Sequence, residues 1–207
     1  QDVPDVADLV WASFPCQDLS LAGAGAGLKG NRSGTFWPFW RLMEGLIKED
    51  RAPKLIVLEN VCGTLTSHDG KDFAAICSTF VKAGYFFGAV VADAVQFVPH
   101  SRPRLFIIGV RDELALTAPS ITSDTPSTIW HTKGLLNAYE KLSSKVRSKW
   151  LWWSPPAPSK RKTTFADLIE EQPQGVEWNS ASETAKLLEM MSEKNLKKVN
   201  DAKKTGR

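Results

Sequence analysis

Three short polar clusters in this sequence carry side chains that could act together on one substrate. They are residues 15–17 (Pro-Cys-Gln), 59–61 (Glu-Asn-Val) and 100–104 (His-Ser-Arg-Pro-Arg). A thiolate is a nucleophile, a carboxyl group holds or donates a proton, and a guanidinium stabilises developing negative charge. Together they indicate covalent catalysis in which the thiol attacks and the other groups manage protons and charge.

Each cluster taken alone also has an ordinary structural explanation. Cys16 could be a small buried hydrophobe, which is the usual role of a single cysteine. The Glu59-Asn60 pair could end a strand or cap a helix, and the two arginines could be surface charges. The chemical interpretation therefore depends on the three clusters meeting at one place.

The elements that would bring the clusters together are the strands of an α/β sheet. Apolar runs predict strands over residues 8–14, 54–58, 87–95 and 105–110, and apolar residues at helical spacing predict helices over 36–49 and 72–83. This order is typical of a sheet with helices on its faces. Ligands gather at the carboxyl ends of such strands. Two clusters follow the first two strands, and the third directly precedes the last one.

The composition changes near Arg111, which we take as a domain boundary between residues 1–111 and residues 112–207. The second part reads as a linker and a smaller irregular and helical region. It contains a Ser/Thr/Pro-rich connector, a short helix, a proline-stiffened linker and one amphipathic helix that begins with a Ser180–Glu183 capping box. These elements span residues 117–126, 132–142, 153–162 and 180–199, respectively.

The 207-residue chain has a net charge of +3, and its basic residues concentrate over residues 141–162 around three tryptophans. This pattern permits a polyanionic partner, and it equally fits a solvated face with aromatic packing. The three cysteines form no CxxC pair, so neither a disulfide framework nor a zinc site is indicated, and a reducing, cytoplasmic setting fits best. No run of about 18 apolar residues supports a membrane span.

In its ordered motifs the sequence resembles the C5-cytosine DNA methyltransferase family. The motifs are SFPCQDLS, RSGTFW, LIVLENV, the Gly84-Tyr85 pair and FVPHSRPRLFIIGVR, and they span residues 13–111. The resemblance implies a Rossmann-like, S-adenosylmethionine-dependent methyltransferase sheet with helices on both faces. It also implies a sheet incomplete at its N-terminus, followed by the start of a target-recognition region.

The resemblance assigns roles to individual residues. Cys16 would add to carbon 6 of an extruded cytosine, Glu59 would bond ring nitrogen 3 and the exocyclic amine, and Arg104 would face the carbonyl oxygen. Arg102 would support this catalytic group. The implied substrate-binding residues are Pro15, Gln17, Ser20, Arg32, Asn60 and His100.

Several of these positions have more specific implied roles. Asn60 would orient the Pro15–Cys16 backbone, and Pro15 would also lie beside the cofactor. Ser20 and Arg32 would touch phosphates, and Gln17 would hold the extruded base. The glycine-rich segment 21–34 has the composition of a lid, and His100 stands where the family usually has glutamine.

The implied cofactor is S-adenosylmethionine, and the implied partner is double-stranded DNA, in a bacterial modification setting with a cognate restriction endonuclease as a candidate second partner. Because the family builds its main cofactor pocket before the Pro-Cys loop, we expect that pocket to lie outside this chain and the chain to be a fragment. Two alternatives remain open: a catalytically silent DNA-binding relative, and a methyltransferase that acts on RNA cytosine.

Overall fold

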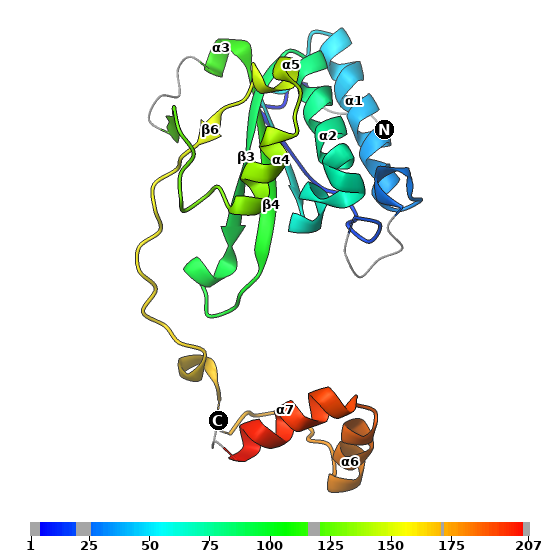
Figure 1. Cartoon of the computed structure of the whole chain (residues 1–207), viewed down its shortest axis with the longest axis vertical. Coiled ribbons are helices and arrows are strands. Elements are labelled where there is room, and N and C mark those ends of the chain that lie inside the picture. The colour runs from blue at the N-terminus through cyan, green and yellow to red at the C-terminus, as the bar shows by residue number, and fades with distance from the viewer. Residues whose placement is uncertain (1–4, 20–25, 116–120, 171, 205–207) are drawn as a thin grey trace. The chain divides into compact units, whose positions relative to one another are not determined.

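Four strands form a mixed sheet in the first of two compact units of the chain (Figure 1). The computed structural model describes residues 5–19, 26–115, 121–170 and 172–204. The two units are Gln1–Phe165 and Ala166–Arg207, and each is described by itself.

The strand order explains how distant sequence clusters reach one edge of the sheet. The strands are β1 (Leu9–Ser13), β2 (Leu55–Asn60), β3 (Tyr85–Asp93) and β4 (Pro103–Arg111), in the order β1-β2-β4-β3. β1 and β2 are parallel, whereas β4 is antiparallel to both β2 and β3. The amino end of β4 therefore lies at the same edge as the carboxyl ends of the other three strands.

One face of the sheet is covered by helices. α1 (Phe36–Lys48) and α2 (Lys71–Lys82) confirm the two helices predicted in this region, and α2 ends before Gly84, whose φ of 77° suits a residue without a side chain. α4 (Lys133–Glu140) and α5 (Ser144–Arg147) contribute to the same core. The buried apolar residues of these four helices are Phe36, Trp40, Met43, Leu46, Phe73, Ile76, Cys77, Phe80, Leu135, Ala138 and Val146.

The opposite face is covered largely by non-helical chain. Trp130 and Trp153 pack there, together with Leu114 of the short helix α3 (Asp112–Ala115). β6 (Trp152–Trp153) pairs with β5 (Thr122–Ser123) in a separate two-stranded sheet. On β1 this face stays open to solvent, since Leu9 and Trp11 are 51% and 56% exposed.

The first compact unit extends beyond the boundary predicted at Arg111. The outer edge of β3 bonds to later chain: Phe87 N donates to Lys149 O at 2.9 Å, Leu151 N donates to Phe87 O at 2.7 Å, and Val91 N donates to Trp130 O at 2.8 Å. These bonds satisfy an edge that would otherwise present unpaired backbone groups. The boundary between the two compact units thus lies after Phe165. That the catalytic and target-recognition parts are separated at Arg111 stays a prediction.

The second unit contains two helices, α6 (Ala181–Glu189) and α7 (Glu193–Lys204). The capping box of Ser180 and Glu183 is confirmed. The prediction of one continuous helix over residues 180–199 is wrong, because the Ser192 carbonyl accepts from Asn195 N and Leu196 N and starts a new helix. Serine favours such terminal positions over helix interiors.

Candidate active site at the carboxyl edge of the sheet

Glu59 and Arg104 form an ion pair at the edge where β1 and β2 end. Arg104 Nε lies 3.0 Å from Glu59 Oε1, and the two side chains are 21% and 23% exposed, respectively. Strand register explains the contact, because Glu59 pairs with Phe106 on β4, two residues beyond Arg104 and on the same side of the strand. The acid and one of the predicted guanidiniums therefore do meet.

Asn60 ties the ends of β1 and β2 together. Its side chain is buried; Nδ2 donates to Phe14 O at 3.0 Å, and Oδ1 accepts from Val61 N at 2.9 Å. Thr64 Oγ1 adds a longer bond of 3.4 Å to the same oxygen. Phe14 directly precedes Pro15 and Cys16, so the Asn60 amide holds the backbone that presents the thiol.

The three cysteines differ in their suitability as nucleophiles. All are free, and Cys16 is half-buried in the turn after β1, where its carbonyl accepts from Leu19 N. Burial raises the pKa of the Cys77 thiol well above its ordinary value. Burial also raises the pKa of Cys62, opposed by the positive charge of Arg104. Cys62 is a second thiol close to the site that sequence reasoning missed, and its only sequence signal is its place directly after Glu59-Asn60-Val61.

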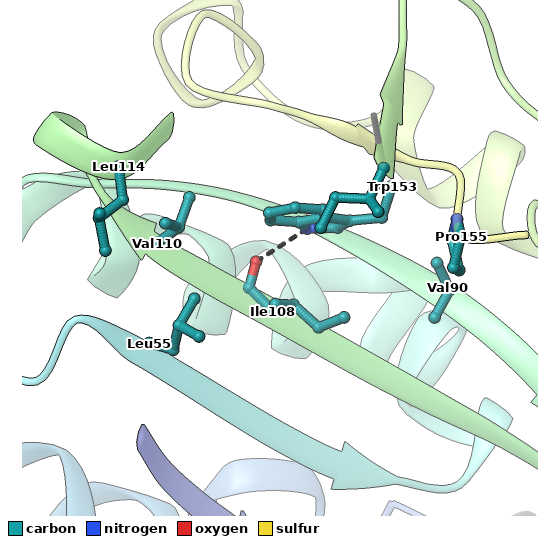
Figure 2. Close-up of a pocket in the computed structure, with 8 residues that line it drawn as sticks. Leu55, Val90, Ile108, Val110, Leu114, Trp153 and Pro155 are labelled. Carbon is teal, nitrogen blue, oxygen red and sulfur yellow. Dashed lines mark hydrogen bonds between the residues drawn. The ribbon is translucent and has the colours of Figure 1, made fainter. Parts of the chain in front are cut away.

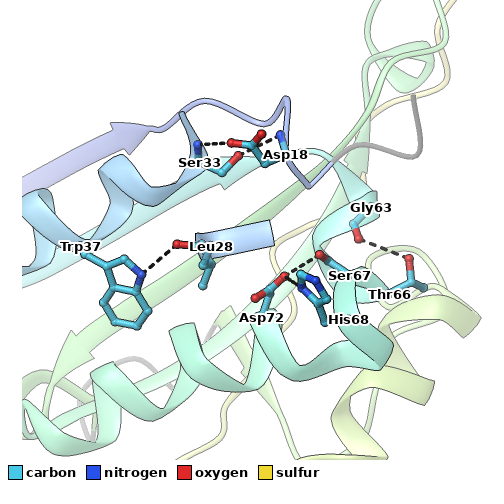
Figure 3. Close-up of polar contacts among 9 residues, drawn as sticks. All are labelled: Asp18, Leu28, Ser33, Trp37, Gly63, Thr66, Ser67, His68 and Asp72. Atoms are coloured by element: carbon cyan, nitrogen blue, oxygen red, sulfur yellow. Dashed lines mark hydrogen bonds and ion pairs between the residues drawn. The ribbon is translucent and has the colours of Figure 1, made fainter. Parts of the chain in front are cut away.

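Asp18 closes the base of the loop that follows Cys16. Ser33 N donates to Asp18 Oδ2 at 2.8 Å, while Asp18 N donates to Ser33 Oγ at 3.1 Å (Figure 3). Arg32 N also bonds this carboxylate, and Arg32 Nη1 donates to Gln17 Oε1 at 2.6 Å. The structure therefore brings Gln17 and Arg32 side by side. Ser20 lies outside the described residues.

Part of the predicted lid is firmly packed. Leu28 is buried, and its carbonyl accepts from Trp37 Nε1 at 3.1 Å. Gly27, with a φ of 58°, lies so close to Asp72 and His68 that any side chain would overlap them. These contacts pack residues 26–34 against α1 and the turn before α2, and the lid role of segment 21–34 stays a prediction. Residues 20–25 lie outside the described part of the chain.

Asp72 forms the other half of this contact. Its Oδ2 accepts from Ser67 Oγ at 2.5 Å and lies 2.8 Å from His68 Nδ1 (Figure 3). His68 and Asp69 both have left-handed backbone, with φ of 47° and 59°. The network thus braces the turn before α2 against the loop that follows the thiol.

The third predicted cluster leaves the sheet between β3 and β4. Pro103 and Arg104 belong to β4, whereas His100 and Arg102 lie in the preceding loop with exposed side chains. Pro15 and Gln17 are also exposed. The Asp93 carboxylate holds the loop, and its backbone hydrogen bond from Val95 keeps the pKa of Asp93 below its usual range.

The basic, tryptophan-bearing segment is largely structural. Trp150 packs against Phe87 at 5.4 Å between ring centroids, and Trp153 Nε1 donates to Ile108 O at 3.1 Å. Lys141 pairs with Asp69 and Lys149 with Asp112. Aromatic packing thus accounts for Trp150 and Trp153, and two of the lysines are paired within the protein.

An apolar cavity of about 340 Å³ lies on the sheet face opposite α1 and α2 (Figure 2). Its lining residues are Leu55, Val90, Ile108, Val110, Leu114, Ile121, Trp153 and Pro155. No titratable side chain lines it, and it does not border Cys16, Glu59 or Arg104. The cavity supplies none of the groups that the predicted chemistry needs.

Comparison with known proteins gives a consistent result. The family model of the C-5 cytosine-specific DNA methylase matches residues 1–207. The type II methyltransferase M.NgoFVII of Neisseria gonorrhoeae is 36% identical over 110 residues, which are 53% of this chain and 28% of that protein. The type II methyltransferase M.HaeII of Haemophilus aegyptius is 37% identical over 120 residues, 57% of this chain and 36% of that protein.

The chain thus spans about a third of the length of these relatives, as the shares of 28% and 36% state. Among solved structures, the Entamoeba histolytica methyltransferase EhMeth matches with a TM-score of 0.42 and 21% identity, over 50% of this chain and 32% of that one. No helix in the described part of the chain is long and apolar enough to cross a membrane.

Proposed function

Because the chain belongs to the C-5 cytosine-specific DNA methylase family, we propose that the whole protein transfers a methyl group to carbon 5 of cytosine in double-stranded DNA. The observation that carries this proposal is the ion pair of Glu59 and Arg104, formed at the sheet edge where Asn60 fastens the backbone leading to Cys16. The three groups come from the ends of three neighbouring strands, since Cys16 follows β1, Glu59 lies near the end of β2 and Arg104 near the start of β4.

The proposed chemistry begins with the Cys16 thiolate. Carbon 5 of cytosine is a weak nucleophile, and addition of sulfur to carbon 6 forms a carbon–sulfur bond and shifts an electron pair toward carbon 5. Carbon 5 can then accept a methyl group. A base then takes the proton from carbon 5, and the electron pair left behind expels sulfur from carbon 6, which restores the ring and returns the Cys16 thiolate.

Glu59 and Arg104 would handle the charge that this addition creates. A carboxyl group that donates to ring nitrogen 3 must carry a proton, and a guanidinium facing the carbonyl oxygen stabilises negative charge there. In the structure the two side chains bond each other. An entering cytosine would therefore exchange this contact for its own hydrogen bonds to both groups.

The surrounding residues would hold the extruded nucleotide. A stacked base must leave the duplex before sulfur can reach carbon 6, at a cost of a few kcal/mol. Arg32 would contact a phosphate and Gln17 the base, and the 2.6 Å bond between them supports a shared task. We also assign Pro15, Ser20 and His100 to substrate binding, Pro15 additionally to the cofactor, and Arg102 to support of Arg104.

Family membership implies S-adenosylmethionine as the methyl donor. A pocket for this group uses a glycine-rich turn after a strand, whereas β1 runs into Pro15 and β2 runs into the short helix Cys62–Leu65. We therefore expect the main contacts of the donor to come from outside the described residues.

We infer the biological setting from the same family. The relatives named above are type II methyltransferases, which supports a bacterial modification role in the cytoplasm with a cognate restriction endonuclease as a second partner. Among the basic residues over 141–162, Arg147 lies over the Tyr139 ring and Arg161 Nε donates to Val95 O. The candidates for phosphate contacts are Lys145, Lys160 and Lys162.

Replacing the thiol tests the proposal directly. In the whole protein, Cys16→Ser should lower the rate of methyl transfer by at least about 1,000-fold, because a hydroxyl of ordinary acidity does not attack carbon 6. Cys62→Ala is the matched control and should stay within about tenfold of the wild type. The rates are measured with labelled donor and a mixture of duplex DNA sequences.

A trapped adduct gives a second readout. A duplex with 5-fluorocytosine has no carbon 5 proton to lose, so the wild type should stay covalently attached and Cys16→Ser should not. Full transfer by Cys16→Ser would remove the thiol from the mechanism. An inert wild type that still binds DNA would favour the silent relative, and transfer confined to RNA would favour the RNA enzyme.

A further inference from the structure

The last residue of β3, Asp93, makes three hydrogen bonds with one carboxylate. Oδ1 accepts from Val95 N at 3.1 Å and from Arg102 N at 2.7 Å, and Oδ2 accepts from Ser101 Oγ at 3.0 Å. The donors come from both ends of the β3–β4 loop. A single side chain therefore joins the point where the chain leaves the sheet to the point where it returns.

The strand register shows which backbone donor this acceptor captures. Asp93 pairs with Pro103 in the antiparallel register of β3 and β4. Phe87 N and Val91 N donate to chain outside the sheet, so every second residue of β3, Asp93 included, turns its backbone N–H and C=O away from β4. The proline therefore costs no ladder bond at this pair. The next donor on this side, Arg102 N, bonds the Asp93 carboxylate at 2.7 Å, and Ala94 N donates to Arg102 O at 3.3 Å.

The start of β4 matters because Arg104 lies just beyond it. Arg104 pairs with Ala92, next to the Asp93–Pro103 pair, and its Nε reaches Glu59 from this position. A slip of one residue in an antiparallel pair turns every side chain to the opposite face. A looser start of β4 would thus move the Arg104 guanidinium away from Glu59.

We propose that Asp93 is a positioning residue that sets the start of β4 and thereby holds Arg104 at Glu59 for catalysis. This inference rests on the proposed function. Asp93 touches neither Glu59 nor the Arg104 side chain through any hydrogen bond described here, so its effect passes through the backbone of residues 101–104.

An electrostatic role is the competing explanation. The charges of Asp93 and Arg104 shift the pKa of the Cys62 thiol in opposite directions, and the charge of His100 acts on Asp93. A carboxylate acting through its charge would lose its effect on neutralisation, whereas one acting through hydrogen bonds would keep it. Asparagine separates the two, because its Oδ1 can still accept from Val95 N and Arg102 N, and its amide can donate to the Ser101 hydroxyl.

The test uses the whole protein and compares Asp93→Ala, Asp93→Asn and Asp93→Ser. Asp93→Ala should lower kcat for methyl transfer about 10- to 100-fold and leave KM for DNA within about threefold, because a small displacement of a reacting group affects the transition state most. Asp93→Asn should recover kcat to within about threefold of the wild type. Asp93→Ser keeps a short cap for Val95 but is too short to reach Arg102 N, so it should resemble Asp93→Ala.

The matched control is Asp8→Ala. Asp8 is an exposed aspartate that pairs with Lys54 at the opposite end of the sheet. This variant should keep kcat and KM, and circular dichroism with thermal unfolding checks that each variant is folded. If Asp93→Ala fails to fold, the comparison of Asp93→Ser with Asp93→Asn decides.

The outcomes separate the inference from the proposed function. A wild type that neither transfers methyl groups nor forms the 5-fluorocytosine adduct would overturn the function and the inference together. An active wild type with an inactive Cys16→Ser, but with folded Asp93→Ala or Asp93→Ser at wild-type kcat, would overturn the inference alone. Equal losses of kcat in Asp93→Asn and Asp93→Ala would show that Asp93 acts through its charge and not through its hydrogen bonds, and would also overturn the inference.

Discussion

Truncation of Asn60 is the sharpest structural test of how the thiol is presented. Asn60→Ala removes the bond to the Phe14 carbonyl at 3.0 Å and the bond from Val61 N at 2.9 Å. Each such bond contributes about 1 kcal/mol net, and a buried partner left unsatisfied costs about 1–3 kcal/mol. Asn60 is only 5% exposed, so water does not readily replace the amide. We expect the free energy of unfolding to fall by about 2–4 kcal/mol.

Two assays check this expectation. Urea or guanidinium unfolding gives the change in the free energy of unfolding. The alkylation rate of Cys16, followed by mass spectrometry of its peptide under native conditions, reports the backbone in front of the thiol. Because Phe14 O loses its donor, the 15–17 turn should loosen, and the alkylation rate should rise. Cys77, which is fully buried in α2, is the internal reference for global opening.

Thr64→Val is the matched control. It removes only the 3.4 Å bond to the Asn60 oxygen, which keeps its donor Val61 N, so the loss should stay below about 1 kcal/mol. The reasoning is refuted if Asn60→Ala costs less than about 1 kcal/mol and leaves the Cys16 rate unchanged. It is equally refuted if Thr64→Val costs as much as Asn60→Ala.

Two further predictions concern stability. Gly88→Ala should destabilise the fold by about 2 kcal/mol or more, because the new methyl group would overlap the Leu151 carbonyl. Gly45→Ala in α1 meets nothing within 4 Å and should stabilise the fold by about 0.5–1 kcal/mol. Thermal unfolding of both variants at the wild-type Tm would contradict this. Burial lowers the pKa of His131 from its ordinary 6.5, so below pH 6.5 the unfolded chain binds a proton that the folded chain does not, and this contribution to stability is lost as the pH falls. His131→Asn, which can still accept from Ser127 N, should flatten that dependence in unfolding titrations between about pH 6.5 and 5, and an unchanged slope would count against it.

Local sequence patterns were sufficient for most of the framework. The run KLIVL predicted a strand buried on both sides, and Ile56, Val57 and Leu58 are all less than 9% exposed. Ser180 and Glu183 predicted their helix start at the correct residue. These features depend on contacts between near neighbours, which a single stretch of sequence records.

The same patterns were poorer guides where a local signal competes with tertiary packing. The glycines of residues 26–34 gave this segment the composition of a lid. In the structure, Gly27 lies so close to Asp72 and His68 that there is no room for a side chain at this position. The tryptophans near residue 150 read as a possible nucleic-acid surface, but Trp150 and Trp153 pack on the sheet. Composition does not distinguish these alternatives.

By itself, the sequence determined the family, the succession of strands and helices along residues 8–110, and the residue types available for chemistry. Only the tertiary structure decided that Glu59 bonds Arg104, that Asn60 bonds Phe14 across 46 residues of chain, and that Asp18 and Asp93 close the two loops around the site. The reason is physical. Strand register and a carboxylate's choice of backbone partner depend on which distant segments become neighbours, and a linear pattern does not contain that information.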